Sequence, residues 1–362
     1  MSRKRPARTL IVSDLHLGAG QSALDDERVC ARLEAAVAES ERLVLLGDTV
    51  ELRARPWREV LRAATPTLQS LGEALPAGGS IVLVAGNHDH GLLAPALARR
   101  AVAEPPPPPL GSATEIEPLG GEPLARVCAA LGAERVRVRY PGVWLADDVY
   151  ATHGHHLDRH TTVPMLERLA IGAVARRAGE PDGGPACAED YEAVLGPVYA
   201  LLDAYAATGA RIRHGASVAA WRALHPAEPG EALPRRLRRS ALRGAFAGAV
   251  AALQRTGIGP LGSDISPEAL RHSALAALGE ALLRLRIDAR LVVFGHTHRA
   301  GPLPGDDPAP WRTATGVQLR NCGCWVREET LAGENRRSPY RPGFCVRLDD
   351  GGEPALVNLL DV

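Results

Sequence analysis

Five short motifs supply side chains that could bind metal ions together. They carry carboxylate and amide oxygens and imidazole nitrogens but no thiolate. This donor set suits manganese, iron or zinc, and it differs from that of a structural zinc site with cysteine ligands. The motifs are Asp14-Leu-His16, Gly47-Asp48, Gly86-Asn87-His88-Asp89, His153-Gly-His155 and Gly295-His296-Thr-His298.

Each motif follows a short run of apolar residues. Runs this short and continuous are typical of strands that are buried on both faces. In open α/β sheets, ligands bind beyond the carboxyl ends of the strands, so we expect the five loops to converge. The runs are Leu10 to Val12, Leu43 to Leu46, Ile81 to Val84, Val149 to Thr152 and Leu291 to Phe294.

Helical patterns separate the first three runs. They cover Asp25 to Ser40 and Trp57 to Leu75, where Pro66 could introduce a break. Strands that alternate with helices indicate an α/β fold. Later segments resemble β-hairpins and suggest a second, more antiparallel sheet. They are Val136 to Tyr140, Gly142 to Leu145, Val317 to Val326, Gly343 to Leu348 and Pro354 to Leu359.

The segment 159–288 differs in composition from the rest of the chain. It is rich in alanine, leucine and arginine and has helical periodicity with few strand signals. We interpret it as a helical insertion or cap, and residues 1–158 and 289–362 as the domain that carries the motifs. The polyproline stretch Pro105 to Pro109 is expected to form an extended surface connection.

With all five motifs in order, the chain resembles the calcineurin-like metallophosphoesterase superfamily. The pattern of that superfamily is D-x-H, G-D, G-N-H-D/E, an isolated H-G and G-H-x-H. Each motif alone recurs by chance, but five in order, each after a strand, are specific. The resemblance implies a four-layer α/β/β/α sandwich of two mixed sheets with a helical insertion. It also implies metal-assisted hydrolysis of a phosphomonoester or phosphodiester.

The resemblance implies two adjoining sites for divalent metal ions. Two ions about 3.5–4 Å apart can clamp the attacking and leaving oxygens of a phosphoryl transfer, and they make a shared water more acidic. The implied ligands are Asp14, His16 and His298 for the first ion, Asn87, His153 and His296 for the second, and Asp48 as a bridge.

The same resemblance suggests roles for five neighbouring residues. His88 would protonate the leaving-group oxygen or stabilise the phosphoryl charge. Glu51 stands where related phosphatases carry an acid that orients this histidine, and Asp89 is the competing candidate. His155 and Arg299 could contact the substrate, but His155 could instead support the ligands and Arg299 could be an ordinary exposed arginine.

One branch of the superfamily is most similar to this chain. The GDTVEL segment and the HGxxxD segment, followed by helices, resemble the UDP-diacylglucosamine pyrophosphohydrolases. That branch typically has arginine where this chain has His88, so its substrate is not carried over. The Asn321 to Trp325 segment matches the stretch that often follows G-H-x-H, and Cys322 and Cys324 are interpreted there as small strand residues.

The charge balance argues against a nuclease. The chain has 42 lysine and arginine residues against 42 aspartate and glutamate residues, and no basic groove with interleaved aromatics is evident. A degenerate scaffold protein that has lost its metal centre is the rival outside the enzymes. Retention of every ligand type and of His88 argues against it.

A membrane-associated enzyme is the remaining rival. The arginines from Arg235 to Arg243 could contact an anionic substrate or a bilayer, so the substrate could be a small molecule or a lipid-linked phosphate ester. No secretory signal or membrane-spanning apolar run is evident, and the six cysteines form no disulfide framework. We therefore expect a cytoplasmic protein, with peripheral membrane contact through the insertion as an option.

Overall fold

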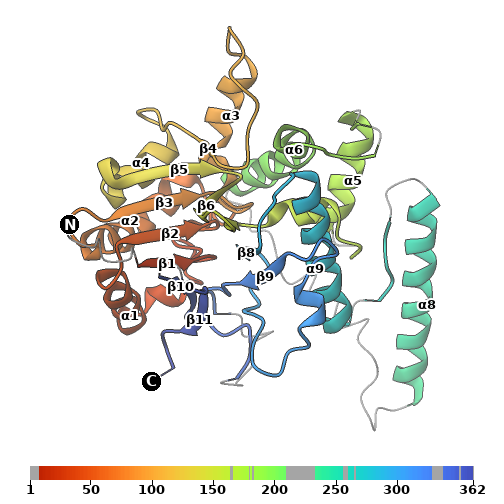
Figure 1. Cartoon of the computed structure of the whole chain (residues 1–362). Helices are drawn as coiled ribbons and strands as arrows, with labels where there is room; N and C mark the ends of the chain where they lie inside the picture. The colour runs from red at the N-terminus through yellow and green to blue at the C-terminus, as the bar shows by residue number, and fades with distance from the viewer. Residues whose placement is uncertain are drawn as a thin grey trace. The chain divides into compact units, whose positions relative to one another are not determined.

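The structure is a computed structural model of the chain, and its described residues form two compact units (Figure 1). One unit lies within Met1–His155, Tyr199–Arg211 and Arg286–Val362, and the other within His156–Val198 and Ile212–Leu285. The predicted domain boundaries at 159 and 288 stay a prediction. The described residues are 8–163, 166–178, 180–181, 183–208, 233–255, 260–264, 266–327, 337–349 and 352–361.

The first unit contains a seven-stranded mixed sheet with the order β11-β10-β1-β2-β3-β5-β4. Strands β1, β2, β3 and β5 run parallel, whereas β10, β11 and β4 pair antiparallel with their neighbours. The strands are β1 (Thr9–Val12), β2 (Arg42–Leu46), β3 (Ser80–Val84), β4 (Thr114–Glu115), β5 (Val136–Tyr140), β10 (Phe344–Leu348) and β11 (Ala355–Asn358).

The same unit contains a four-stranded mixed sheet with the order β6-β7-β8-β9. Strand β6 is antiparallel to β7, while β7, β8 and β9 run parallel. The strands are β6 (Gly142–Ala146), β7 (Val149–Thr152), β8 (Leu291–Phe294) and β9 (Gln318–Asn321).

The expected distribution of strands between the sheets is partly wrong. Three of the hairpin-like segments, which form β5, β10 and β11, join the first sheet, and the second sheet is more parallel than expected. Residue patterns identify a strand by its burial, but they do not specify which partner it pairs with.

The two sheets pack on a shared apolar core. Small and branched side chains fill it, because successive residues of a strand point to opposite faces and one face of each sheet lies against the other. The predicted fold class, an α/β sandwich of two mixed sheets, is therefore confirmed. Core residues include Ile11, Val44, Val84 and Val346 from the first sheet and Val143, Ala151, Leu291 and Val293 from the second.

Helices α1 (Glu27–Ala38), α2 (Trp57–Ala74) and α4 (Pro123–Leu131) pack side by side on the seven-stranded sheet (Figure 1). Helix α1 begins where the Asp26 side chain accepts a hydrogen bond from the Arg28 amide, a common N-cap arrangement. Helix α2 continues through Pro66, where the sequence suggested a break. The buried face on both sides of the proline, which includes Val60 and Leu71, offsets the lost backbone hydrogen bond.

Shorter elements complete the first unit. Helix α3 (Ala94–Ala101) and the short 3₁₀ helices η1 (Ala23–Asp25), η2 (His90–Leu92), η3 (Ala133–Arg135) and η5 (Ala309–Trp311) lie in its connections. The Pro105 to Pro109 stretch is irregular and mostly exposed, as predicted.

The second unit is helical in its described residues. Its elements are η4 (His155–Arg159), α5 (Leu166–Ala178), the first half of α6 (Ala188–Ala207), α8 (Leu233–Arg255) and α9 (Pro267–Arg284). The second half of α6, from Tyr199, belongs to the first unit. In the part of the chain that the structure describes, no helix has the length and apolar character needed to cross a membrane.

Gly72→Ala should destabilise the protein by about 1–3 kcal/mol, because a Cβ at this position of α2 would meet the Leu131 carbonyl oxygen of α4 at 2.5 Å. Gly244→Ala, on the exposed surface of α8 with no atom within 4 Å of the added Cβ, should instead be neutral or stabilise by about 0.5–1 kcal/mol. Urea unfolding of both variants checks this difference. Equal stability of the two would contradict the close α2–α4 contact.

Candidate metal centre

The loops that follow β1, β2, β3, β7 and β8 carry the five motifs, and backbone hydrogen bonds join them. The Asp14 amide donates to the Gly47 carbonyl oxygen at 3.0 Å, which links the loops after β1 and β2. The Gly295 amide donates to the His153 carbonyl oxygen at 3.0 Å, which links the loops after β7 and β8. The motifs therefore converge at one edge of the two sheets.

A first group of donor atoms comes from three side chains. His298 Nε2 lies 3.2 Å from Asp14 Oδ1 and 3.2 Å from His16 Nε2. The distance from His16 Nε2 to Asp14 Oδ1 is 3.8 Å. These three residues could hold one metal ion.

A second group lies around His153. Its Nε2 atom is 3.3 Å from Asp48 Oδ2 and 3.2 Å from Asn87 Oδ1. Asn87 Oδ1 is also 3.1 Å from His296 Nδ1. Asp48, His153 and His296 could hold a metal ion, with the Asn87 oxygen beside it.

Asp48 lies between the two groups. Its Oδ2 atom is 3.7 Å from His16 Nε2 in the first group and 3.3 Å from His153 Nε2 in the second. Its other oxygen, Oδ1, accepts a hydrogen bond of 2.8 Å from the His88 backbone amide. That bond fixes the carboxylate so that Oδ2 faces both groups, the placement that a bridging ligand needs.

The residues present fit bound cations. Asp14 Oδ1 is buried and accepts no hydrogen bond, although an unpaired buried carboxylate oxygen is costly. In the second group, Asn87 Oδ1 faces ring nitrogens and the Asp48 carboxylate. If the amide were reversed, its nitrogen would lie within hydrogen-bond range of all three neighbours and could donate to them. In the present orientation, a cation bound to the Asn87 oxygen would offset the repulsion between these acceptor atoms.

When no cation is bound, protons take its place. Burial lowers the pKa of His16, but the neighbouring Asp14 and Glu51 carboxylates raise it more strongly, to about 10. Burial likewise lowers the pKa of His153, and the nearby Asp48 and Asp14 charges raise it to about 9. A bound cation would displace these protons, so metal affinity should rise with pH.

The outer nitrogen of each of two imidazoles is held in place. His153 Nδ1 lies 2.9 Å from the Leu46 carbonyl oxygen, which can only accept, so Nδ1 carries the proton of this bond. His16 Nδ1 lies 2.6 Å from Glu51 Oε2. Both rings therefore present Nε2 to the donor groups, as histidines that bind metal ions usually do.

The backbone is strained at the same place. Among the described residues, six other than glycine have a positive φ, and five of them belong to the two donor groups. Such conformations cost about 1–3 kcal/mol each and persist where the surrounding structure enforces them, often at functional sites. The five are Asp14 (57°), His16 (45°), Asp48 (51°), His296 (67°) and His298 (58°).

Two motif glycines are required by close packing. A Cβ at Gly47 would lie 2.3 Å from His153 Nδ1, and one at Gly86 would lie 2.2 Å from Asp48 Oδ1. No other residue leaves these atoms in place, which explains why glycine precedes the polar residue in both motifs.

Glu51 contacts His88, whereas Asp89 does not. Glu51 Oε2 lies 2.7 Å from His88 Nδ1, and Glu51 Oε1 accepts a hydrogen bond from the Arg53 amide. Asp89 accepts hydrogen bonds from the Thr49 and Gly86 amides instead and so braces the loops after β2 and β3. Of the two predicted orienting acids, Glu51 has the geometry for that role.

Three charges act on His88. Burial lowers its pKa, the Glu51 carboxylate raises it, the Arg53 charge lowers it and the Asp48 carboxylate raises it, so that the net shift is downward. The ring is therefore neutral at neutral pH in the free protein. An anionic phosphate bound beside it would favour the protonated form.

The two predicted substrate contacts are already engaged. His155 is fully buried, its Nε2 lies 3.3 Å from Tyr140 Oη, and its ring stacks on Tyr140. Arg299 donates two hydrogen bonds to Asp306, at 3.1 and 2.6 Å, and lies over the Trp311 ring. Each would have to change partners to bind a substrate, so a substrate role for either stays a prediction.

Sequence reasoning missed several supporting residues. Ser13 Oγ donates to Asp14 Oδ2 at 2.5 Å, and Asn321 Nδ2 donates to the Gly295 carbonyl oxygen at 2.8 Å. Arg53 is buried and its guanidinium lies over the Tyr199 ring, which comes from the second half of α6. An arginine two residues after Glu51 was the available signal for Arg53. None pointed to Tyr199, which lies inside the predicted insertion.

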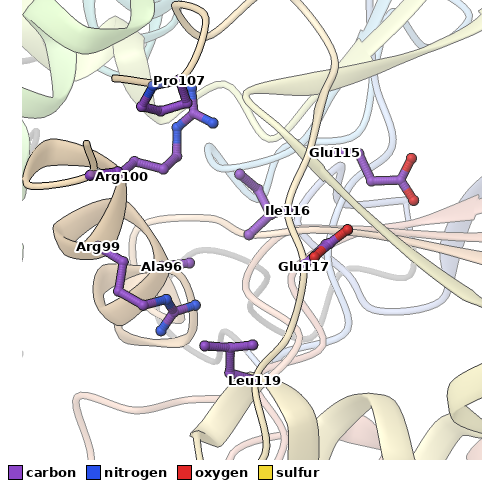
Figure 2. Close-up of a pocket in the computed structure, with 9 residues that line it drawn as sticks. Ala96, Arg99, Arg100, Pro107, Glu115, Ile116, Glu117 and Leu119 are labelled. Atoms are coloured by element: carbon purple, nitrogen blue, oxygen red, sulfur yellow. The ribbon is translucent and has the colours of Figure 1, made fainter. Parts of the chain in front are cut away.

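A separate surface hollow of the first unit lies at α3 and β4 (Figure 2). Its volume is about 430 Å³, and its lining includes Arg99, Arg100, Glu115 and Glu117. Arg99 forms an ion pair with Glu122. None of the predicted site residues lines this hollow.

Comparisons with known proteins leave the family open. No protein-family model and no curated protein matches the chain. Among solved structures, the chain is similar to the cold-active protein-tyrosine phosphatase of the psychrophile Shewanella sp. The identity is 13% over 98% of this chain and 78% of the other, with a TM-score of 0.33. A TM-score this low assigns neither fold nor activity, so function must be argued from the residues of the candidate centre.

Gly86→Ala should lower metal binding without unfolding the protein, because the added Cβ would displace the Asp48 carboxylate and the His153 ring. Gly120→Ala is the matched control, since no atom lies within 4 Å of its added Cβ. Elemental analysis after loading with manganese and gel filtration measures the difference. Equal metal content in the two variants would show that the groups around Asp48 are not the binding site.

Proposed function

We propose that this protein is a metal-dependent phosphoesterase of the calcineurin-like superfamily that uses two divalent ions of manganese, iron or zinc. One observation carries the proposal: seven oxygen and nitrogen donors from five loops form two adjoining groups that share Asp48. The order and residue types of the five motifs support it independently. Burial of five of the seven donors supports it further, since buried charges are normally paired or bound to metals.

The protein groups would divide the work. Two bound ions would supply positive charge to the phosphoryl oxygens and lower the pKa of the attacking water. Asp48 would hold the two sites in a fixed relation, because its second oxygen is anchored by the His88 amide. The Glu51 contacts to His16 and His88 would keep both rings in fixed orientations relative to the reacting phosphate.

His88 is proposed to serve the leaving group. Its side chain is about one-fifth exposed, at 21%, whereas that of His16 is 5% exposed, so His88 is the more accessible of the two rings held by Glu51. A substrate phosphate would favour the protonated ring, which could then donate a proton to the departing oxygen or stabilise the phosphoryl charge.

The substrate class is proposed as a phosphomonoester or phosphodiester of a small or lipid-linked molecule. The similarity of the GDTVEL and HGxxxD segments to the UDP-diacylglucosamine pyrophosphohydrolases supports including UDP-sugars among the candidates. A screen of manganese-loaded protein against mono-aryl and bis-aryl phosphates, UDP-sugars and cyclic nucleotides tests the class. Absence of turnover with every compound would contradict the proposed activity.

Asp48→Asn should abolish turnover of the best screened ester, because the amide removes the negative charge shared by both sites. Hydrolysis should fall to the level of the chelator-treated parent, with an unchanged far-UV circular dichroism spectrum. Asp147→Asn, at an exposed position, is the matched control and should retain the parent rate. Full activity in Asp48→Asn would exclude the shared-carboxylate role.

His88→Ala should lower kcat by about 10²- to 10⁴-fold, the range typical of a lost proton donor, while two metal ions stay bound. His272→Ala, an exposed histidine on α9, controls for the substitution itself. Metal content and kcat are measured on the same preparations. Loss of both metals in His88→Ala would show that this residue belongs to the ligands.

A further inference from the structure

The second unit contains a pocket of about 430 Å³, within the usual size of small-molecule sites. Its walls combine two arginines and a histidine with two hydroxyl groups, a set of hydrogen-bond donors that suits an oxyanion. The residues that matter here are Arg159, His160, Thr162, Ser273, Glu280 and Arg284.

The two arginines of the wall already have acidic partners. Arg159 Nε donates to Glu180 Oε1 at 2.8 Å, and a second bond joins Arg159 Nη2 to the other carboxylate oxygen. Arg284 Nε donates to Glu280 Oε1 at 2.6 Å. These two pairs leave the wall close to electrically neutral.

Arg168 on α5 adds a charge that is not paired in this way. It is only 2% exposed, and its Nε donates to the Thr161 carbonyl oxygen at 2.8 Å. Its Nη1 and Nη2 atoms are buried and make no hydrogen bond. The carboxylates of Glu180 and Asp158 are near enough to act on it, but neither bonds to it.

This guanidinium is joined to the pocket wall through Thr161. Thr161, which binds Arg168 Nε, stands between two wall residues, and its Oγ1 lies 3.1 Å from Ser273 Oγ. Burial lowers the pKa of Arg168 to about 10, which leaves it charged at neutral pH. The charge of Arg168 reaches the wall residue His160. Burial lowers the pKa of His160 most, and the charges of Arg159, Arg284 and Arg168 lower it further, to about 3.

We propose that this pocket binds a phosphate group, with Arg168 supplying the positive charge. A buried guanidinium with two unpaired nitrogens is costly, and an anion nearby reduces that cost. Phosphate is proposed rather than a carboxylate because its additional oxygens can accept from the Thr162 and Ser273 hydroxyls, which lie 2.9 Å apart in the pocket wall. All these residues belong to the second unit, whereas the candidate metal ligands belong to the first.

Isothermal titration with inorganic phosphate at constant ionic strength tests the proposal. The full chain carries Asp48→Asn, so that phosphate held by metal ions in the first unit does not contribute. We expect one phosphate per chain, and acetate should not bind detectably. Absence of phosphate binding, or equal binding of acetate, would overturn the proposal.

Three further substitutions on this background assign the binding. Arg168→Met should weaken it by about tenfold or more, Arg168→Lys should retain most of the affinity, and Arg177→Met, exposed on the same helix, should leave it unchanged. Arg168→Met removes an unpaired buried charge and is expected to fold. If it does not, Ser273→Ala must weaken phosphate binding instead. Parent affinity in Arg168→Met or, failing that variant, in Ser273→Ala would overturn the proposal.

Discussion

The candidate metal centre brings together oxygen and nitrogen atoms whose lone pairs repel one another, and the first unit holds them there. Carboxylate oxygens of Asp14 and Asp48 lie 3.2 to 3.8 Å from imidazole nitrogens, and the Asn87 amide oxygen lies 3.1 Å from His296 Nδ1. Most of these side chains are buried. Such atoms stay together only if positive charge lies among them, as protons or as metal ions. The pKa values of His16 and His153 are raised for the same reason, because a protonated imidazole supplies positive charge to the site.

The surrounding fold imposes this arrangement against local preferences. Five residues adopt left-handed backbone conformations, and glycine is required where the neighbouring loops touch the ligands. Burial of the two-sheet core supplies the free energy that holds these loops in place. A function for this site explains why five of the six described non-glycine residues with a positive φ lie at this edge.

Much of the fold could be predicted from the sequence. Short apolar runs such as Leu43 to Leu46 identified the buried strands, and the rule that ligands lie beyond strand ends brought the motif loops together. The partner of each strand could not be predicted, because pairing depends on contacts between distant segments. That is why β10 and β11 were assigned to the wrong sheet. Tyr199 and Arg168 were missed for a similar reason, since an isolated aromatic or basic residue on a helix normally indicates only a core or surface position.

The central claim is that two cations lie on either side of the Asp48 carboxylate. Anomalous diffraction from crystals of manganese-loaded protein, measured at the metal absorption edge, tests it most directly. The account predicts two peaks about 3.5–4 Å apart, one beside Asp14, His16 and His298 and the other beside Asn87, His153 and His296. No peak at either position, in crystals of protein that retains manganese in solution, would contradict it.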